Sequence, residues 1–127
     1  MSYLLDTHTF LWWATNPARL SSTCQQLLTE NETILLSVVT IWELQIKIQT
    51  GKLRLALPLA QLVQEQIEQN NLQLLPVHLG HVLALEQFPL HHRDPFDRLL
   101  AAQTQVEQAT LLTADTAFSA YNVPTLW

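Results

Sequence analysis

The chain has 127 residues, a formal net charge of −5, 48% hydrophobic residues and only 13% charged residues. This length favours one domain, which we expect to span residues 1–127, and the composition excludes disordered, collagen-like and repeat proteins. The acidic balance argues against a domain that holds nucleic acid by bulk electrostatics, but it leaves nucleic acid open as a substrate.

Cysteine content and apolar run lengths indicate where the protein works. Cys24 is the single cysteine, so an internal disulfide is excluded, and no apolar run reaches the ~20 residues of a membrane helix. The first residues lack the basic and apolar regions of a signal peptide. We therefore expect a cytoplasmic protein that makes no contact with membranes.

The first half of the chain alternates apolar runs with segments of helical spacing. In order, we expect a strand at 3–5, a helix at 8–14, a helix from Ser21 or Ser22 through Glu30, a strand at 33–39 and a helix at 41–48 that stops at Gly51. Strand and helix thus occur twice before residue 52.

The second half continues this alternation. We expect a helix from Pro58 to Asn70, a strand at 72–77, a short helix at 80–87, a helix at 95–108 with Asp94 as its N-cap, a strand at 110–113 and a short last strand after Pro124. Most of these strands are apolar throughout, which is typical of parallel sheets covered on both faces. The predicted fold class is α/β, with a small parallel β-sheet flanked by helices.

Four acidic residues lie near the carboxyl ends of the predicted strands, where open α/β sheets bind ligands. Asp6 closes the first strand and Asp115 follows the fourth, whereas Glu43 and Asp97 lie in early turns of the helices after the second strand and before the fourth. If the strands that carry them are neighbours, these carboxylates converge in one pocket.

Converging carboxylates indicate a particular kind of chemistry. They repel one another unless cations or protons neutralise them, and oxygen ligands favour Mg²⁺ or Mn²⁺. Such ions activate water for phosphodiester hydrolysis. No GxSxG motif, Cys–His pair or glycine-rich phosphate loop offers a competing mechanism.

Each acid also has a structural alternative. Glu43 could form a surface ion pair with Lys47, Asp97 could stabilise the start of its helix, and Asp94 is explained as an N-cap. Asp115 could cap a short helix that runs through Ala120. Asp6 is the hardest to explain structurally, because a carboxylate at the end of a buried strand is costly without a partner.

Histidine and tryptophan pairs have simpler explanations. His91 and His92 are expected to be solvated loop residues, and His8 could either touch the acidic pocket or cover it. Trp12 and Trp13 are adjacent, so we expect that they cannot both face one core from a helix and that one of them marks an interface.

The acids belong to longer segments whose order along the chain is informative. These segments are 4–12 (LLDTHTFLW), 37–47 with its Trp-Glu pair, 51–53 (GKL), 92–98 (HRDPFDR) with 101–103 (AAQ), and 112–115 (LTAD). Together they resemble the PIN-domain family, and more narrowly the VapC-type toxins of bacterial toxin–antitoxin systems. The match runs from Tyr3 to about Val123.

The resemblance implies a Mg²⁺- or Mn²⁺-dependent endoribonuclease that acts as a toxin. By position, Asp6, Glu43, Asp97 and Asp115 match the family's catalytic and metal-binding quartet, and Asp94, Thr7 and Thr113 match accessory positions. The resemblance also implies a homodimer and a cognate antitoxin that covers the acidic pocket. Lys47, Lys52, Arg54, Arg93 and Arg98 lie in the same segments as the acids and could contact RNA phosphate.

Other classes of protein remain as alternatives. A phosphoacceptor receiver domain needs a lysine after a late strand, and a haloacid dehalogenase-type phosphatase needs Asp-x-Asp where this chain has Asp6-Thr7-His8. A non-catalytic protein-interaction module with a tryptophan- and leucine-rich surface would need no metal ion.

Overall fold

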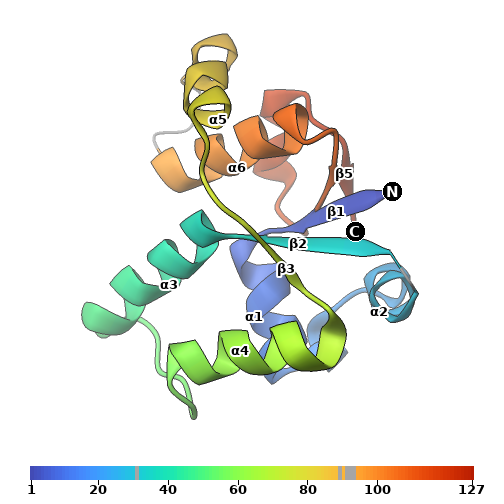
Figure 1. Cartoon of the computed structure of the whole chain (residues 1–127), viewed down its shortest axis with the longest axis vertical. Coiled ribbons are helices and arrows are strands. Elements are labelled where there is room, and N and C mark those ends of the chain that lie inside the picture. Colours follow the sequence, from blue (N-terminus) through green and yellow to red (C-terminus); the bar gives the residue numbers. More distant parts are fainter. Residues whose placement is uncertain (31, 89, 91–93) are drawn as a thin grey trace.

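The computed structural model describes residues 1–30, 32–88, 90 and 94–127. Its five strands form one parallel sheet in the order β3-β2-β1-β4-β5. The strands are β1 (Ser2–Leu5), β2 (Thr33–Ser37), β3 (Gln73–Leu75), β4 (Thr110–Leu112) and β5 (Thr125–Leu126). This sheet and the helices on both of its sides (Figure 1) confirm the predicted fold class.

The helices follow the predicted order. They are α1 (Thr7–Thr15), α2 (Ser22–Thr29), α3 (Val38–Gln49), α4 (Leu59–Asn70), α5 (Leu79–Ala84) and α6 (Pro95–Val106), with 3₁₀ turns η1 (Pro17–Arg19), η2 (Leu85–Gln87) and η3 (Thr116–Tyr121). The predicted N-caps of α2 and α6 are confirmed, since Ser21 Oγ accepts from Cys24 N at 3.1 Å and Asp94 Oδ1 accepts from Phe96 N at 2.9 Å. In the described parts of the chain, no helix is long and apolar enough to cross a bilayer.

The second strand is shorter than the predicted range 33–39. It ends at Ser37, whose Oγ accepts a hydrogen bond from Val39 N at 3.1 Å and so caps α3. The β-branched residues after Ser37 favour a strand by propensity, but the cap and the burial of Val39 and Thr40 draw them into the helix.

Two further elements differ from their predicted ranges: the third strand is shorter, and the predicted helix at 80–87 is divided. The third strand covers only Gln73–Leu75 of the predicted 72–77, and Pro76, which has no N–H to donate to a neighbouring strand, follows it directly. The predicted helix at 80–87 is split into α5 and η2.

Helices lie on both sides of the sheet (Figure 1), and each side packs on the sheet through its own apolar core. Tyr3 and Leu5 of β1 pack with residues of α1, α2, α3 and α4, including Phe10. Leu4, which points to the opposite face, packs with Leu100 of α6 and with other residues of α6, β4 and η3. The alternation along β1 therefore buries both faces, as the uninterrupted apolar strands predicted.

The end of α3 depends on a glycine. Gly51 has φ +76°, and the N–H groups of Lys52 and Leu53 both donate to Lys47 O, at 2.9 and 3.1 Å. A Cβ at Gly51 would meet no atom within 4 Å, so only the backbone conformation opposes substitution.

We therefore expect Gly51→Ala to lower the free energy of unfolding by about 1 kcal/mol, measured by urea denaturation. Gly80→Ala is the matched control, because Gly80 lies within α5, has open space around its Cα and no positive φ. There alanine should leave stability unchanged or raise it. Equal losses in both variants would contradict this explanation.

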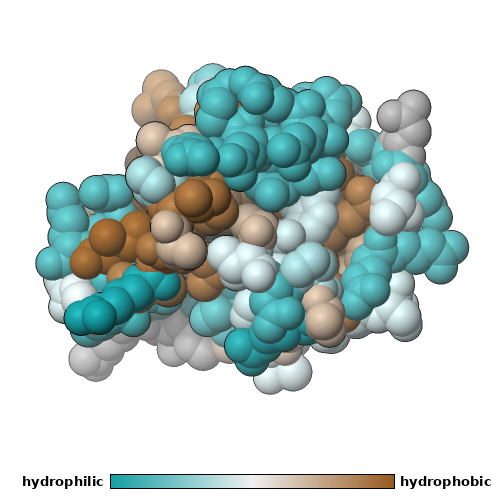
Figure 2. Space-filling model, turned by 90° about the horizontal axis from the view of Figure 1, so that it is seen from below, coloured by the Kyte–Doolittle hydropathy of each residue, from teal (hydrophilic) through white to brown (hydrophobic). Residues whose placement is uncertain are grey.

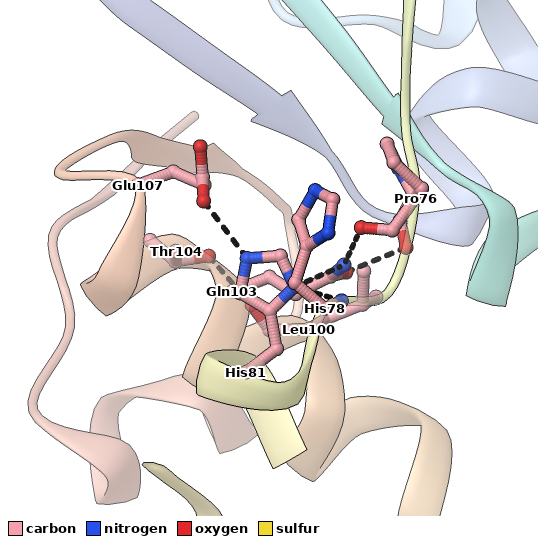
Figure 3. A network of polar contacts seen from close by, with 8 residues as sticks. Pro76, His78, His81, Leu100, Gln103, Thr104 and Glu107 are labelled. Carbon is pink, nitrogen blue, oxygen red and sulfur yellow. Dashed lines mark hydrogen bonds and ion pairs between the residues drawn. The ribbon is translucent and has the colours of Figure 1, made fainter. Parts of the chain in front are cut away.

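A buried glutamine connects α6 to the ends of two strands (Figure 3). Gln103 of α6 is fully buried; its Oε1 accepts from Ser37 Oγ at the start of α3, and its Nε2 donates to Pro76 O at 3.3 Å. The amide therefore ties α6 to the carboxyl ends of β2 and β3. Its bond to Ser37 links α6 to the start of α3, and these two helices carry Asp97 and Glu43.

A buried histidine extends this network to α5 (Figure 3). His81 Nδ1 accepts from His78 N at 3.0 Å, and its Nε2 lies 2.8 Å from Glu107 Oε2. Because Nδ1 accepts a main-chain N–H, the proton of the neutral ring lies on Nε2, which donates to Glu107. His81 thus anchors α5 to the end of α6.

Candidate active site

Asp6 and Asp115 follow neighbouring strands at the point where the sheet order changes direction. From β1 the chain builds β2 and β3 on one side and then β4 and β5 on the other. Leu5 pairs with Leu112, so the residues after β1 and β4 leave the sheet side by side. Such switch points are where open α/β sheets bind ligands.

One pocket of about 180 Å³ lies at this point. All four predicted carboxylates line it, and the full set of lining residues is Asp6, Thr7, His8, Glu43, Lys47, Asp94, Asp97, Asp115 and Phe118. The structure thus brings the predicted acids together from β1, α3, α6 and the segment after β4. His8 contributes to the wall, and Phe118 is a lining residue that the sequence pattern did not indicate.

Asp6 is buried and held at both carboxylate oxygens. Its Oδ1 accepts from Thr9 N at 2.8 Å, which caps α1, and its Oδ2 accepts from Thr113 Oγ1. Thr113 Oγ1 in turn accepts from Asp115 N at 3.0 Å. One threonine therefore connects two acids of the pocket and fixes their relative position.

Glu43 has both of the environments considered from sequence. Its Oε2 lies 3.1 Å from Lys47 Nζ, so the predicted ion pair forms. Its Oε1 accepts from Thr7 Oγ1 at 2.7 Å, and only 13% of the side chain is exposed. Glu43 is therefore held in the pocket wall, and the lysine brings a positive charge to the same pocket.

Asp115 and Asp94 both cap the elements that follow them. Asp115 Oδ1 accepts from Ala117 N at 2.9 Å and caps η3, as its structural alternative predicted. Asp94 caps α6. A capping bond occupies one oxygen of each carboxylate, so the cap and a role in the pocket are compatible.

Asp97 is the acid with a strongly shifted pKa. Burial raises the pKa of Asp97 to about 7, with further upward contributions from the charges of Asp94, Glu43, Asp115 and Asp6. Every acid in the pocket thus opposes ionisation of this carboxyl group. A cation in the pocket would reverse that effect.

The donor set fits a hydrated magnesium or manganese ion. Within the described ranges, no three carboxylate, imidazole or thiol groups stand close enough to ligate one ion together. Mg²⁺ commonly keeps several waters and uses only one or two carboxylates plus substrate phosphate. A pocket of about 180 Å³ lined by oxygen ligands has room for an ion with part of its water shell.

The predicted phosphate contacts are placed in different ways. Lys47 lines the pocket. Arg98 instead donates from Nη2 to the main-chain oxygens of Leu85 and Phe88, both at 3.2 Å, and does not line the pocket. Arg54 borders another hollow. Arg93, like His91 and His92, lies outside the described residues.

The two adjacent tryptophans differ from expectation. Both are partly buried and both pack against the same core, so the prediction that they cannot share one core was wrong. The indole rings extend far enough from α1 to reach this core while facing different hollows. Trp12 lines a hollow next to the acidic pocket, whereas Trp13 lines one with Leu28 and Ile34.

A larger apolar hollow lies away from the acids, at the loop between α3 and α4. It measures about 540 Å³ and is lined by Ile48, Gly51 and residues 53–59, four of which are leucines. Figure 2 views the molecule from below and shows apolar surface at its left, the side of α3 and this loop in Figure 1. No acidic residue lines this hollow, and the charged residue in its wall is Arg54.

Comparison with known proteins identifies the class to which this fold and pocket belong. The family model of the PIN domain matches residues 3–124, and the chain therefore belongs to the PIN domain family. It is 27% identical over 129 residues to Ribonuclease VapC22 of Mycobacterium tuberculosis, an alignment that covers 98% of this chain and 97% of the relative.

Solved structures with the same fold include toxin–antitoxin complexes. VapBC2 from Rickettsia felis, bound to a promoter DNA fragment, matches with a TM-score of 0.74 and 20% identity over 99% of this chain and 98% of that one. FitAcB from Neisseria gonorrhoeae matches with a TM-score of 0.66 and 21% identity over 98% and 96%. The predicted resemblance to VapC-type proteins is confirmed.

Proposed function

We propose that this protein is a Mg²⁺- or Mn²⁺-dependent endoribonuclease and the toxin of a toxin–antitoxin pair. The observation that carries the proposal is the pocket in which Asp6, Glu43, Asp97 and Asp115 meet at the switch point of a PIN-domain sheet. The name of its mycobacterial relative, a VapC ribonuclease, supports the same activity.

Different residues of the chain would bind the cation, orient the acids and contact the RNA phosphate. Asp6, Glu43, Asp97 and Asp115 would surround the cation, with one or two of them as direct ligands and the others acting through its bound water. When bound, the cation supplies charge that activates water and stabilises the leaving oxygen. Thr113 and Thr7 orient Asp6 and Glu43 through their hydroxyl groups. Lys47 places a positive charge where an RNA phosphate would enter.

The partners follow from the same proposal. The VapBC and Fit structures with this fold support a cognate antitoxin, which would block access to the acidic pocket. We also propose a homodimer, supported by exposed apolar side chains on and beside α5, such as Leu79, Val82 and Leu83. A cytoplasmic location remains a prediction.

The decisive experiment is cleavage of transfer, ribosomal and messenger RNA by the purified protein without its antitoxin. We expect cutting with Mg²⁺ or Mn²⁺ and none with chelator. Asp115→Asn, prepared identically, controls for contaminating nuclease, because asparagine caps η3 as well as aspartate does and preserves the fold. Equal cutting by both proteins, or no cutting by folded wild type with metal, would contradict the proposal.

The hydroxyl of Thr113 provides a separate prediction. Thr113→Val keeps the shape of the side chain but removes the bonds to Asp6 Oδ2 and Asp115 N. We expect the rate of RNA cleavage to fall roughly 10- to 100-fold, as is usual when a residue that orients metal ligands is lost.

The matched control is Thr116→Val, since Thr116 is exposed and follows Asp115 without lining the acidic pocket. Its cleavage rate should stay close to that of wild type. A positioning role for Thr113 also predicts that the Mg²⁺ concentration for half-maximal activity rises in Thr113→Val. Unchanged metal dependence would assign Thr113 a purely structural role.

A further inference from the structure

The acidic pocket opens into a second hollow with aromatic walls. Asp6, His8 and Asp115 line both the pocket and a neighbouring hollow of about 250 Å³, which is completed by Trp12 and Ala114. A chain bound at the acids can therefore continue into this hollow without leaving the surface.

The Trp12 ring that lines this hollow is in contact with other rings and with a cation. The ring centroids of His8 and Trp12 lie 5.6 Å apart, and those of Trp12 and Trp127 lie 5.7 Å apart. The guanidinium of Arg19 lies 4.6 Å from the centroid of Trp12. Among the described residues, Arg19 has no carboxylate within ion-pair distance, so its charge is available to an anion.

Trp12 differs from its neighbour Trp13 in the hollow that it lines. Both side chains are partly buried against the same core. Of these two residues, Trp12 lines a hollow that shares Asp6, His8 and Asp115 with the acidic pocket, whereas the hollow lined by Trp13 shares no residue with that pocket. Trp13 therefore serves as the control for the effect of losing a tryptophan that only packs against the core.

We propose that the hollow beside the acids binds one unpaired base of the RNA, which stacks on Trp12 while the adjoining phosphodiester group lies among the carboxylates. This inference rests on the proposed endoribonuclease function. The hollow has a volume of about 250 Å³, which lies below the roughly 300 Å³ of sites for larger ligands and suits a single base. Arg19, whose guanidinium lies over the Trp12 ring, adds a positive charge next to this site and leaves the other face of the indole for the base.

The proposal predicts which bases of the RNA this hollow accepts. A base can stack on an indole ring only when it is unpaired, because bases in an RNA helix are already stacked on one another. Aromatic stacking accepts every base, since each has a flat face. Stacking on Trp12 would therefore add affinity for an unpaired base without selecting one particular nucleotide.

The test compares RNA with and without bases. Binding of labelled oligouridylate, and of an oligomer of equal length without bases, is measured with Mg²⁺ in the Asp97→Asn background to prevent cleavage. We expect Trp12→Ala to weaken binding of oligouridylate roughly 5- to 100-fold, which corresponds to ~1–3 kcal/mol per stacked base. Binding of the base-free oligomer should not change, and Trp12→Phe should retain most of the affinity.

Controls separate stacking from folding and from the nuclease proposal. Trp13→Ala should bind both oligomers like its parent, and a thermal melt reports any loss of structure in each variant. Equal losses on both oligomers, or equal effects of the two tryptophans, would overturn the stacking site and leave the nuclease intact. Binding that depends on Trp12 in a wild-type protein that cleaves no RNA would overturn the nuclease and keep the stacking site.

Discussion

Asp97→Asn is expected to abolish cleavage and at the same time to stabilise the metal-free protein. The substitution removes a carboxyl group whose ionisation is opposed by burial and by four other acids, which together raise its pKa to about 7. It also removes a proposed cation ligand, so we expect the rate of RNA cleavage to fall at least roughly 10²- to 10³-fold. Function and stability thus move in opposite directions.

The pH dependence follows from the direction of the shift. The folded protein holds the Asp97 proton more tightly than the unfolded chain, whose carboxyl group has a pKa of 3.8. Stability from this group is therefore complete below about pH 4 and is lost as the pH rises to about 7. Asparagine does not titrate, so the variant avoids this loss.

The expected gain at pH 8 in chelator is ~2 kcal/mol. The shift of about three pKa units corresponds to ~4 kcal/mol, which we halve because Asp97 is partly exposed to solvent. The favourable effect of a negative charge at the start of α6, ~0.3–1 kcal/mol, is smaller and does not reverse the sign.

Urea denaturation at pH 4, 6 and 8 measures this effect, with Glu86→Gln as the matched control. Glu86 is an exposed acid outside the pocket, so its removal changes the net charge equally and should leave stability nearly unchanged. A gain for Asp97→Asn that is the same at pH 4 and pH 8 would contradict the repulsion argument.

Apolar strand patterns predicted both the sheet and the meeting of the acids. Because most of the predicted strands are apolar throughout, the sequence indicated parallel strands buried on both faces, and the carboxyl ends of such strands lie at one edge. That geometry predicted one pocket for Asp6 and Asp115 on the condition that their strands are neighbours, and the pairing of β1 with β4 meets this condition. Capping patterns likewise predicted Asp94 as the N-cap of α6.

Other features depend on contacts that no local pattern contains. Ser37 and Gln103 are 66 residues apart, so neither their bond nor the early start of α3 at Val38 follows from spacing. The pKa of Asp97 depends on burial and on charges from three separate segments. Arg98 looked available for RNA, yet its guanidinium contacts main-chain oxygens of residues 85 and 88.

Gln103→Leu is expected to destabilise the fold by about 2–4 kcal/mol and to slow cleavage without touching the pocket. Leucine fits a buried position on α6 but cannot accept from Ser37 Oγ or donate to Pro76 O. A buried hydroxyl without an acceptor costs ~1–3 kcal/mol, and the altered side-chain shape adds a packing cost.

A double-mutant cycle measures how strongly Gln103 and Ser37 depend on each other for the free energy of unfolding. Ser37→Ala alone loses the cap of α3 and leaves Gln103 Oε1 unpaired, whereas the double variant Ser37→Ala/Gln103→Leu leaves neither partner orphaned. The double variant should therefore lose at least ~1 kcal/mol less than the sum of the single losses in urea denaturation. Additive losses would show that the two side chains act independently.

The same bond links stability to the separation of the acids. Ser37 begins the helix that carries Glu43, and Gln103 lies on the helix that carries Asp97, so their hydrogen bond sets how far apart these carboxylates stand. Loss of the bond should raise the Mg²⁺ concentration needed for half-maximal cleavage in protein that is still folded at the assay temperature. Because Gln103 is fully buried and does not line the pocket, such a change must arise through the elements that Gln103 joins, which are α6, the start of α3 and the end of β3.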